Sequence, residues 1–165
     1  MSAASAALPV RAVNAVGRAL ATQGIDPVRL DVPRLLAGAE RATGLADWGD
    51  GGFRKALERY MDACRSEARL SLLGRIAVQR DTLRILRNRL QLVDERNRHP
   101  EIAEERIVRP LVVVGMPRSG TSILHELLAL DPENRTPLIW EAMFACPRPR
   151  PETYHSDSRI ALPAE

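Results

Sequence analysis

The residues best suited to chemistry gather in one short segment in the last third of the chain. Gly115 and Gly120 bracket a loop that holds Arg118, and the hydroxyl residues Thr121 and Ser122 follow directly. Main-chain amides at the start of a helix have no intrahelical partner, and together with the helix dipole they attract anions. A glycine-bounded loop that opens into a helix is therefore typical of a phosphate-binding site.

The stretches on either side of this loop predict the elements that would position it. Residues 111–114 form a continuous aliphatic run, which is the pattern of a buried parallel strand. After the loop, leucine and isoleucine recur on one side of a helix that residues 131–134 end. We expect that apolar side to pack on a sheet. The sequence thus predicts a strand, an anion-binding loop and a helix; the alternative is the same three elements without a ligand.

The loop departs from the common nucleotide-binding pattern at one position. The pattern Gly-x-x-x-x-Gly-Lys-[Ser/Thr] fits at Gly115, Gly120 and Ser122, but Thr121 stands where the lysine would be. Kinases and ATPases use that lysine to reach the β- and γ-phosphates. A hydroxyl at this position suits a shorter anionic group, with Arg118 supplying a cation from within the loop.

The loop sequence also resembles a known family. Residues 115–122, Gly-Met-Pro-Arg-Ser-Gly-Thr-Ser, resemble the 5′-phosphosulfate loop of sulfotransferases, and we call them the phosphate loop. They look like the branch whose loop reads Pro-Arg-Ser-Gly-Thr-[Thr/Ser], which includes the tyrosylprotein enzymes and many bacterial relatives. Residues 127–132 and 136–141 are similar to the bacterial members as well. The resemblance implies a P-loop α/β fold with a parallel sheet, and 3′-phosphoadenosine 5′-phosphosulfate (PAPS) as the sulfuryl donor, without a metal.

The same resemblance assigns roles to individual residues. The residues that would bind the donor's 5′ end are Pro117, Arg118, Ser119, Gly120, Thr121 and Ser122. Arg118 would also neutralise charge that develops during transfer, and Glu141 stands where the tyrosylprotein branch has its catalytic base. His125 is the alternative base. Trp140 and Phe144 would line the acceptor pocket or belong to the core. The acceptor would be a hydroxyl or amine on a small molecule or another partner.

The extent of the chain limits what the resemblance implies. One parallel-strand pattern is present, whereas a doubly wound sheet needs several strands with crossover helices. No counterpart of the family's Arg and Ser pair for the donor's 3′-phosphate can be placed before Glu165. We therefore expect an N-terminal portion of a sulfotransferase, either a fragment or a truncated gene product. It would have an incomplete sheet, little activity alone and an edge that favours self-association.

The expected division is an N-terminal helical region over residues 1–109 and the start of the sulfotransferase domain over residues 110–165. Apolar residues recur at helical spacing in four stretches of the first region: 9–22, 32–43, 53–68 and 72–93. Asp31 is suited to cap the second helix and Gly44 to end it. A loop at 47–52 precedes the third.

The composition of the chain limits the classes of protein to which it can belong. At 165 residues and 45% hydrophobic, the chain can bury one core. Its net charge is +3, but acids are interspersed among the arginines, which argues against a nucleic-acid partner. Cys64 and Cys146 suit neither a metal site nor a disulfide framework, so we expect a cytoplasmic protein. The first twenty residues lack the core of a secretion signal, and no apolar run suits a membrane span.

Two other functions compete with the sulfotransferase hypothesis. A P-loop kinase or hydrolase would share the loop, but Thr121 in place of lysine counts against it, as does the lack of an acidic run to hold magnesium. A non-catalytic interaction module would use the helical first hundred residues to bind a partner. Both remain alternatives at this stage.

Overall fold

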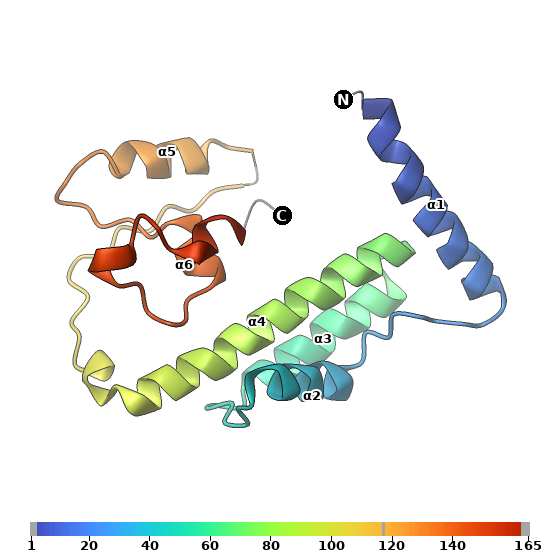
Figure 1. Cartoon of the computed structure of the whole chain (residues 1–165), viewed down its shortest axis with the longest axis horizontal. Helices are drawn as coiled ribbons and strands as arrows, with labels where there is room; N and C mark the ends of the chain where they lie inside the picture. The colour runs from blue at the N-terminus through green and yellow to red at the C-terminus, as the bar shows by residue number, and fades with distance from the viewer. Residues whose placement is uncertain (1–2, 117, 163–165) are drawn as a thin grey trace. The chain divides into compact units, whose positions relative to one another are not determined.

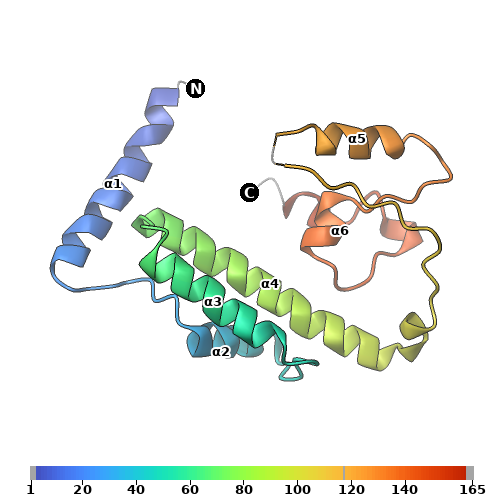
Figure 2. The same cartoon turned by 180° about the vertical axis from the view of Figure 1, so that it is seen from behind.

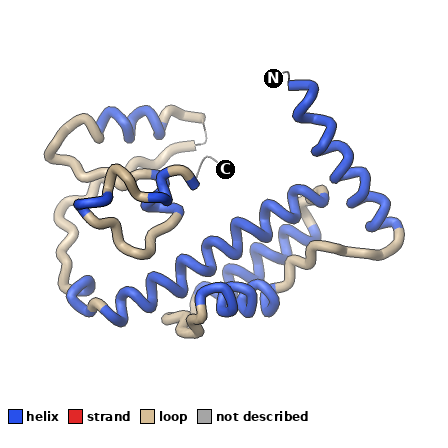
Figure 3. The backbone as a smooth tube through the Cα atoms, viewed as in Figure 1, coloured by secondary structure: helices blue, strands red, loops and turns tan. Residues whose placement is uncertain are grey.

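The computed structural model describes residues 3–116 and 118–162, and the regular elements in these ranges are all helical (Figure 3). They divide into two compact units, one ending at Asp94 and one starting at Glu95, and each is described by itself. The α-helices are α1 (Ala3–Thr22), α2 (Val32–Thr43), α3 (Phe53–Ser66), α4 (Leu72–Arg98), α5 (Thr121–Leu128) and α6 (Ile139–Met143) (Figure 1). Short 3₁₀ helices are η1 (Pro100–Ala103), η2 (Pro151–Thr153) and η3 (Ser158–Ile160).

The four helices predicted before residue 110 are all present. The boundaries of α2 follow local chemistry, because the Asp31 carboxylate accepts a hydrogen bond of 3.3 Å from the Arg34 amide and caps the first turn. At the other end Gly44 has φ 71°, a left-handed conformation that glycine adopts without steric cost, and its amide donates to Glu40 O. The predicted loop at 47–52 is also confirmed.

The core of the first unit lies among α2, α3 and α4, which run side by side in both views (Figures 1 and 2). Leu30, Leu35, Met61 and Leu90 are almost completely shielded from water, at 0–2% exposed. These side chains come from the segment before α2, from α2, from α3 and from α4. Burial of each such side chain contributes about 1.5–3 kcal/mol, so this cluster dominates the stability of the unit.

An aromatic group attaches the loop between α2 and α3 to the core. The indole Nε1 of Trp48 donates to Glu40 Oε1 over 2.8 Å, and its ring stacks on Phe53 with centroids 5.4 Å apart. Arg89 from α4 lies 4.2 Å from the Phe53 ring centroid and donates from Nε to the Trp48 carbonyl. Because the polar edge of Trp48 has a partner, the indole can be buried without loss of a hydrogen bond.

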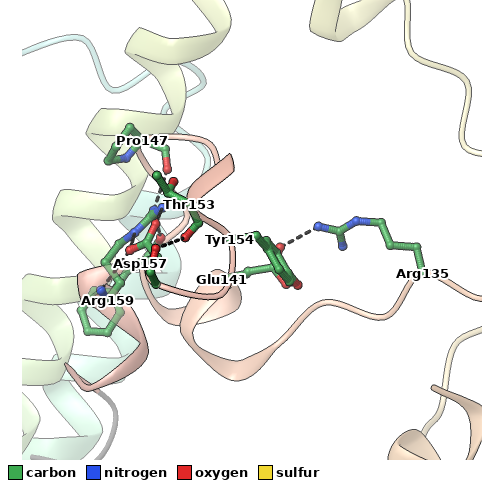
Figure 4. Close-up of polar contacts among 9 residues, drawn as sticks. Arg135, Glu141, Pro147, Thr153, Tyr154, Asp157 and Arg159 are labelled. Carbon is green, nitrogen blue, oxygen red and sulfur yellow. Dashed lines mark hydrogen bonds and ion pairs between the residues drawn. The ribbon is translucent and has the colours of Figure 1, made fainter. Parts of the chain in front are cut away.

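In the second unit the last 3₁₀ turn packs on α6 around the buried ring of Trp140, which is 2% exposed. The Arg159 guanidinium lies 4.8 Å from the centroid of that ring and pairs with Asp157 over 2.6 Å. Arg159 Nη1 also donates to the carbonyls of Phe144 and Pro147, over 2.8 and 2.6 Å (Figure 4). The hydrogen bonds from Arg159 lower the pKa of Asp157 to about 2, so this pair stays charged at neutral pH.

The predicted α/β fold with a parallel sheet is wrong for the residues that the structure describes. Residues 111–114 are extended but carry no ladder hydrogen bonds, and no other part of ranges 3–116 and 118–162 is a strand. Val112 and Val114 are 74% and 87% exposed. An aliphatic run becomes a strand only when another strand satisfies its amides and carbonyls, and none does so here.

The helix after the loop is present as α5, but its expected packing on a sheet is also wrong. Its apolar side chains remain largely in contact with water, with Ile123 at 65% and Leu127 at 58% exposed. The helix ends at Leu128, just before the predicted stop. The hydrophobic pattern was therefore a reliable guide to the helix and a poor guide to what covers it.

We expect Leu90→Ala to lower the free energy of unfolding of the first unit by about 3 kcal/mol, because it leaves a cavity in the core. The matched control is Leu92→Ala on the same helix, where the side chain is 42% exposed; it should change that free energy by less than about 1 kcal/mol. Urea unfolding followed by the NMR signal of the Trp48 indole measures both. Equal effects of the two substitutions would contradict the assignment of the core.

Candidate functional site

The phosphate loop is tightly folded on itself. A methyl group in place of the Gly115 hydrogen would lie 2.6 Å from Cγ2 of Thr121 and 2.7 Å from Oγ of Ser119. A Cβ atom at this position would therefore require the side chains of Ser119 and Thr121 to shift, and glycine lets them pack directly against the backbone. The Ser119 amide donates to the Met116 carbonyl over 3.1 Å and closes a turn. The structure therefore brings together three of the residues that the sequence placed in one loop.

Two residues of the loop have a positive φ, a left-handed backbone conformation that residues with a side chain rarely adopt. Gly120 has φ 88°, with open space around its missing Cβ, so glycine is required there for its conformation and not for its size. Arg118 has φ 69°, which is uncommon for a residue with a side chain. Its side chain is exposed. Arg69 and Arg109, which lie outside the loop, also have positive φ, at 45° and 53°.

Helix α5 begins at Thr121, directly after Gly120, and no side chain caps its first turn. Its first amides are therefore available to an anion, together with the hydroxyls of Thr121 and Ser122. Thr121 is half-buried, while Ser119 and Ser122 are exposed. Pro117, the remaining predicted donor-binding residue, lies outside the described residues. His125 is half-buried in α5, one turn after the loop.

Glu141 is held by three hydrogen-bond donors in the second unit. Its side chain is 8% exposed. Oε1 accepts from Arg135 Nη2 over 2.6 Å, and Oε2 accepts from the Leu138 amide over 2.6 Å and the Tyr154 hydroxyl over 2.9 Å (Figure 4). The contact with the Leu138 amide satisfies an otherwise unpaired donor at the start of α6. Glu141 thus joins the connector before α6, the helix itself and the end of η2.

The ionisation of Glu141 is set by opposing effects. Burial raises the pKa of the carboxyl, but the hydrogen bonds from Leu138, Tyr154 and Arg135 lower it further than burial raises it. The net pKa lies below the usual value, so the carboxylate is charged at neutral pH. Because the pKa falls on folding, Glu141 stabilises the fold above its unfolded pKa. That contribution is lost as the pH falls through the folded pKa.

Sequence reasoning missed Arg135 and Tyr154 as partners of Glu141. They lie 6 and 13 residues away along the chain, and both reach it through irregular segments that have no periodic pattern. Only the contact with Leu138 had a sequence signal, a glutamate at the third position of a short apolar helix. Trp140, one residue before, belongs to the core. Among the described residues, no hydrogen bond or ion pair joins the Glu141 group to the phosphate loop.

Comparison with known proteins shows what this chain is similar to. Residues 110–163 match the model of the sulfotransferase family. The fold is similar to that of the sulfotransferase STF1 from Mycobacterium tuberculosis H37Rv, with 34% identity and a TM-score of 0.72 over 82% of this chain. The resemblance to the sulfotransferase family is therefore confirmed. It is also similar to the sulfotransferase STF9 from Mycobacterium avium, with 30% identity and a TM-score of 0.73 over 85% of this chain.

The chain spans a little over a third of the length of both solved relatives, 37% of the first and 36% of the second. No protein of curated function matches the sequence. Within residues 3–116 and 118–162, no group of three or more His, Cys, Asp or Glu side chains is arranged to hold a metal ion. No helix in the described part is long and apolar enough to cross a membrane.

We expect Tyr154→Phe to raise the pKa of Glu141, because burial persists while one donor to the carboxylate is lost. The free energy of unfolding of the second unit should fall by about 1–2 kcal/mol. Carboxyl-carbon NMR titration of Glu141 measures the pKa directly. Tyr60→Phe, in the first unit, is the control and should leave Glu141 unchanged. An unshifted Glu141 pKa in Tyr154→Phe would show that this hydrogen bond is not maintained in solution.

Proposed function

We propose that this chain provides the donor-binding start of a sulfotransferase that transfers a sulfuryl group from PAPS to an acceptor hydroxyl or amine. The observation that carries the proposal is the phosphate loop, in which Gly115 fits closely against Ser119 and Thr121 while Gly120 opens into α5. The family membership of residues 110–163 supports the same conclusion. When bound, PAPS would supply an activated sulfuryl group attached to its 5′-phosphate.

The loop fits the 5′ end of this donor on chemical grounds. Uncapped amides at the start of α5 and the hydroxyls of Ser119, Thr121 and Ser122 are donors that anionic oxygens accept. Arg118 adds a permanent positive charge, and its planar guanidinium can form paired hydrogen bonds to phosphate or sulfate. The lack of a lysine at Thr121 supports a donor without a γ-phosphate over ATP. Pro117 completes the set that we assign to the donor.

Arg118 would act on the reaction by electrostatics. Sulfuryl transfer leaves negative charge on the bridging oxygen, and a fixed cation beside it lowers the energy of the transition state. The strained backbone of Arg118 supports a role of this kind, since an exposed arginine contributes little to folding. By analogy with phosphoryl transfer, positioning and charge stabilisation should supply most of the rate.

Glu141 is the base that we propose for the acceptor's proton. Its depressed pKa supports the proposal in one respect, because the carboxylate is in the proton-accepting form at neutral pH. Among the described residues, Oε1 accepts a hydrogen bond from Arg135 alone, whereas Oε2 accepts from two donors. Oε1 is therefore the atom that would take the proton. A low pKa makes a weak base, so transfer would require Arg135, which is 69% exposed, to move aside.

The division of the chain into regions, its location in the cell and its self-association remain predictions. We propose that residues 1–109 form a helical region and that the sulfotransferase domain starts at residue 110, which is where the family match begins. A cytoplasmic location is the second. Self-association through exposed apolar surface is the third, and the 70% exposure of Leu111 supports it.

Adenosine 3′,5′-bisphosphate should bind this chain and shift the NMR signals of the Gly115 and Gly120 amides. Arg118→Ala should weaken that binding by roughly tenfold or more without a change in the circular dichroism spectrum, because a charge-assisted contact is lost from an exposed residue. ATP with magnesium should produce no comparable shift. The control is Arg87→Ala, an exposed arginine of α4, which should bind normally. Tighter binding of ATP with magnesium would favour a kinase or hydrolase instead.

The base role is tested by Glu141→Gln in the complete enzyme. If Glu141 takes the acceptor's proton, turnover should fall by roughly a hundredfold or more, while calorimetric affinity for adenosine 3′,5′-bisphosphate stays close to normal. Arg135→Gln removes one donor to Glu141 and serves as the comparison; it should raise the pKa of Glu141 and leave a functional base. Normal turnover in Glu141→Gln would end the assignment and make His125 the candidate.

A further inference from the structure

A cleft in the first unit is surrounded by arginines that have no role in the site described above. It has a volume of about 520 Å³ and lies between α2, the segment before it and α4. Arg29, Arg34 and Arg41 line it, and its apolar floor includes Leu35, Gly38 and Leu83. Cavities of about 300–1,000 Å³ are the size that binds small molecules.

The spacing of residues in α2 places two of these arginines on the same face of the helix. Arg34 and Arg41 are seven residues apart, which is two helical turns or about 10 Å, so both lie on one face. Gly38 lies between them on the same face and lets Leu83 of α4 approach the backbone of α2 closely. A methyl group there would lie 3.2 Å from Cδ2 of Leu83, so the floor is closely packed from below. The two arginines therefore flank the point at which Leu83 packs on the backbone of α2 and forms part of the cleft floor.

The charge of the cleft is not balanced within the protein. In the part of the chain that the structure describes, the side chains of Arg29, Arg34 and Arg41 have no hydrogen bond or ion pair. The one acidic residue that lines the cleft, Asp26, is already neutralised, because its Oδ2 pairs with Arg75 over 2.9 Å. Asp26 Oδ1 accepts from the Val28 amide over 3.3 Å. Three positive charges thus face one small volume without a counterion from the chain.

We propose that this cleft binds a compact ligand with two phosphate groups. Guanidinium groups form paired hydrogen bonds to phosphate oxygens, and three of them match the charge of a bisphosphate better than that of a single anion. The apolar floor would contact whatever connects the two phosphates, and Gln79 adds an amide that can donate or accept. The cleft belongs to the first unit and the phosphate loop to the second.

Inorganic pyrophosphate is the probe, titrated into this chain at constant ionic strength. Binding should shift the Gly38 amide signal with a stoichiometry of one, and inorganic phosphate should bind more weakly. Arg34→Gln combined with Arg41→Gln should weaken pyrophosphate binding at Gly38 by roughly tenfold or more. Both side chains are exposed, so the fold should be unaffected. The control, Arg59→Gln with Arg87→Gln, removes the same charge from exposed positions outside the cleft and should bind as the unchanged protein does.

Arg118→Ala separates this site from the phosphate loop. It should abolish any response of the Gly120 amide to pyrophosphate and leave the response of Gly38 intact, whatever the outcome of the sulfotransferase proposal. Equal loss of affinity in the control pair would overturn the cleft site, because it would show an effect of net charge alone. So would an unshifted Gly38 signal. A shift of Gly38 with a short single-stranded RNA but not with pyrophosphate would also overturn the proposal of a small ligand.

Discussion

The second unit depends on one constraint, which is that a buried carboxylate must be supplied with donors. Glu141 has almost no contact with water, and an unpaired charge in that position would cost several kcal/mol. Its three donors come from the connector before α6, from the first amide position of α6 and from the end of η2. Satisfying one side chain therefore sets the path of the chain over about twenty residues. The guanidinium of Arg159 does the same for the last turn by contacting Trp140 and two carbonyls.

The first unit is organised by a different force. Its helices form because apolar residues recur at helical spacing, and they stay together because Leu30, Leu35, Met61 and Leu90 leave water completely or nearly so. Polar contacts there are peripheral and attach loops to a core that already exists, as Trp48 does through Glu40. Exposed arginines are compatible with this helical core, because their aliphatic stems cover apolar surface while their charges stay in water.

The phosphate loop is held together in a different way from the two groups of contacts described above. The loop is compact without a hydrophobic core beneath it, because the close fit of Gly115 against Ser119 and Thr121 acts over a few residues. The aliphatic residues on either side are exposed, from Ile107 at 82% to Leu130 at 77%. The loop is thus locally complete although the apolar surfaces beside it are exposed.

Local sequence was sufficient for α1 to α5 and for the caps of α2. Asp31, Gly44 and Gly120 act on backbone groups within a few residues of themselves, so their effect can be predicted without knowledge of the fold. The resemblance to sulfotransferases rested on the phosphate loop and on residues 127–132 and 136–141, and it was confirmed by comparison.

Tertiary structure alone decided how Glu141 is held, where the arginine cleft lies and whether residues 111–114 form a strand. Tyr154 lies 13 residues after Glu141 in the sequence and donates a hydrogen bond to it. The negative charge of Asp26 at the cleft is offset by an ion pair with Arg75, which lies on α4. The aliphatic run has the composition of a buried strand, but a strand exists only where a second segment pairs with it. Each outcome depends on groups that are distant in sequence, and no local pattern of residues specifies their position.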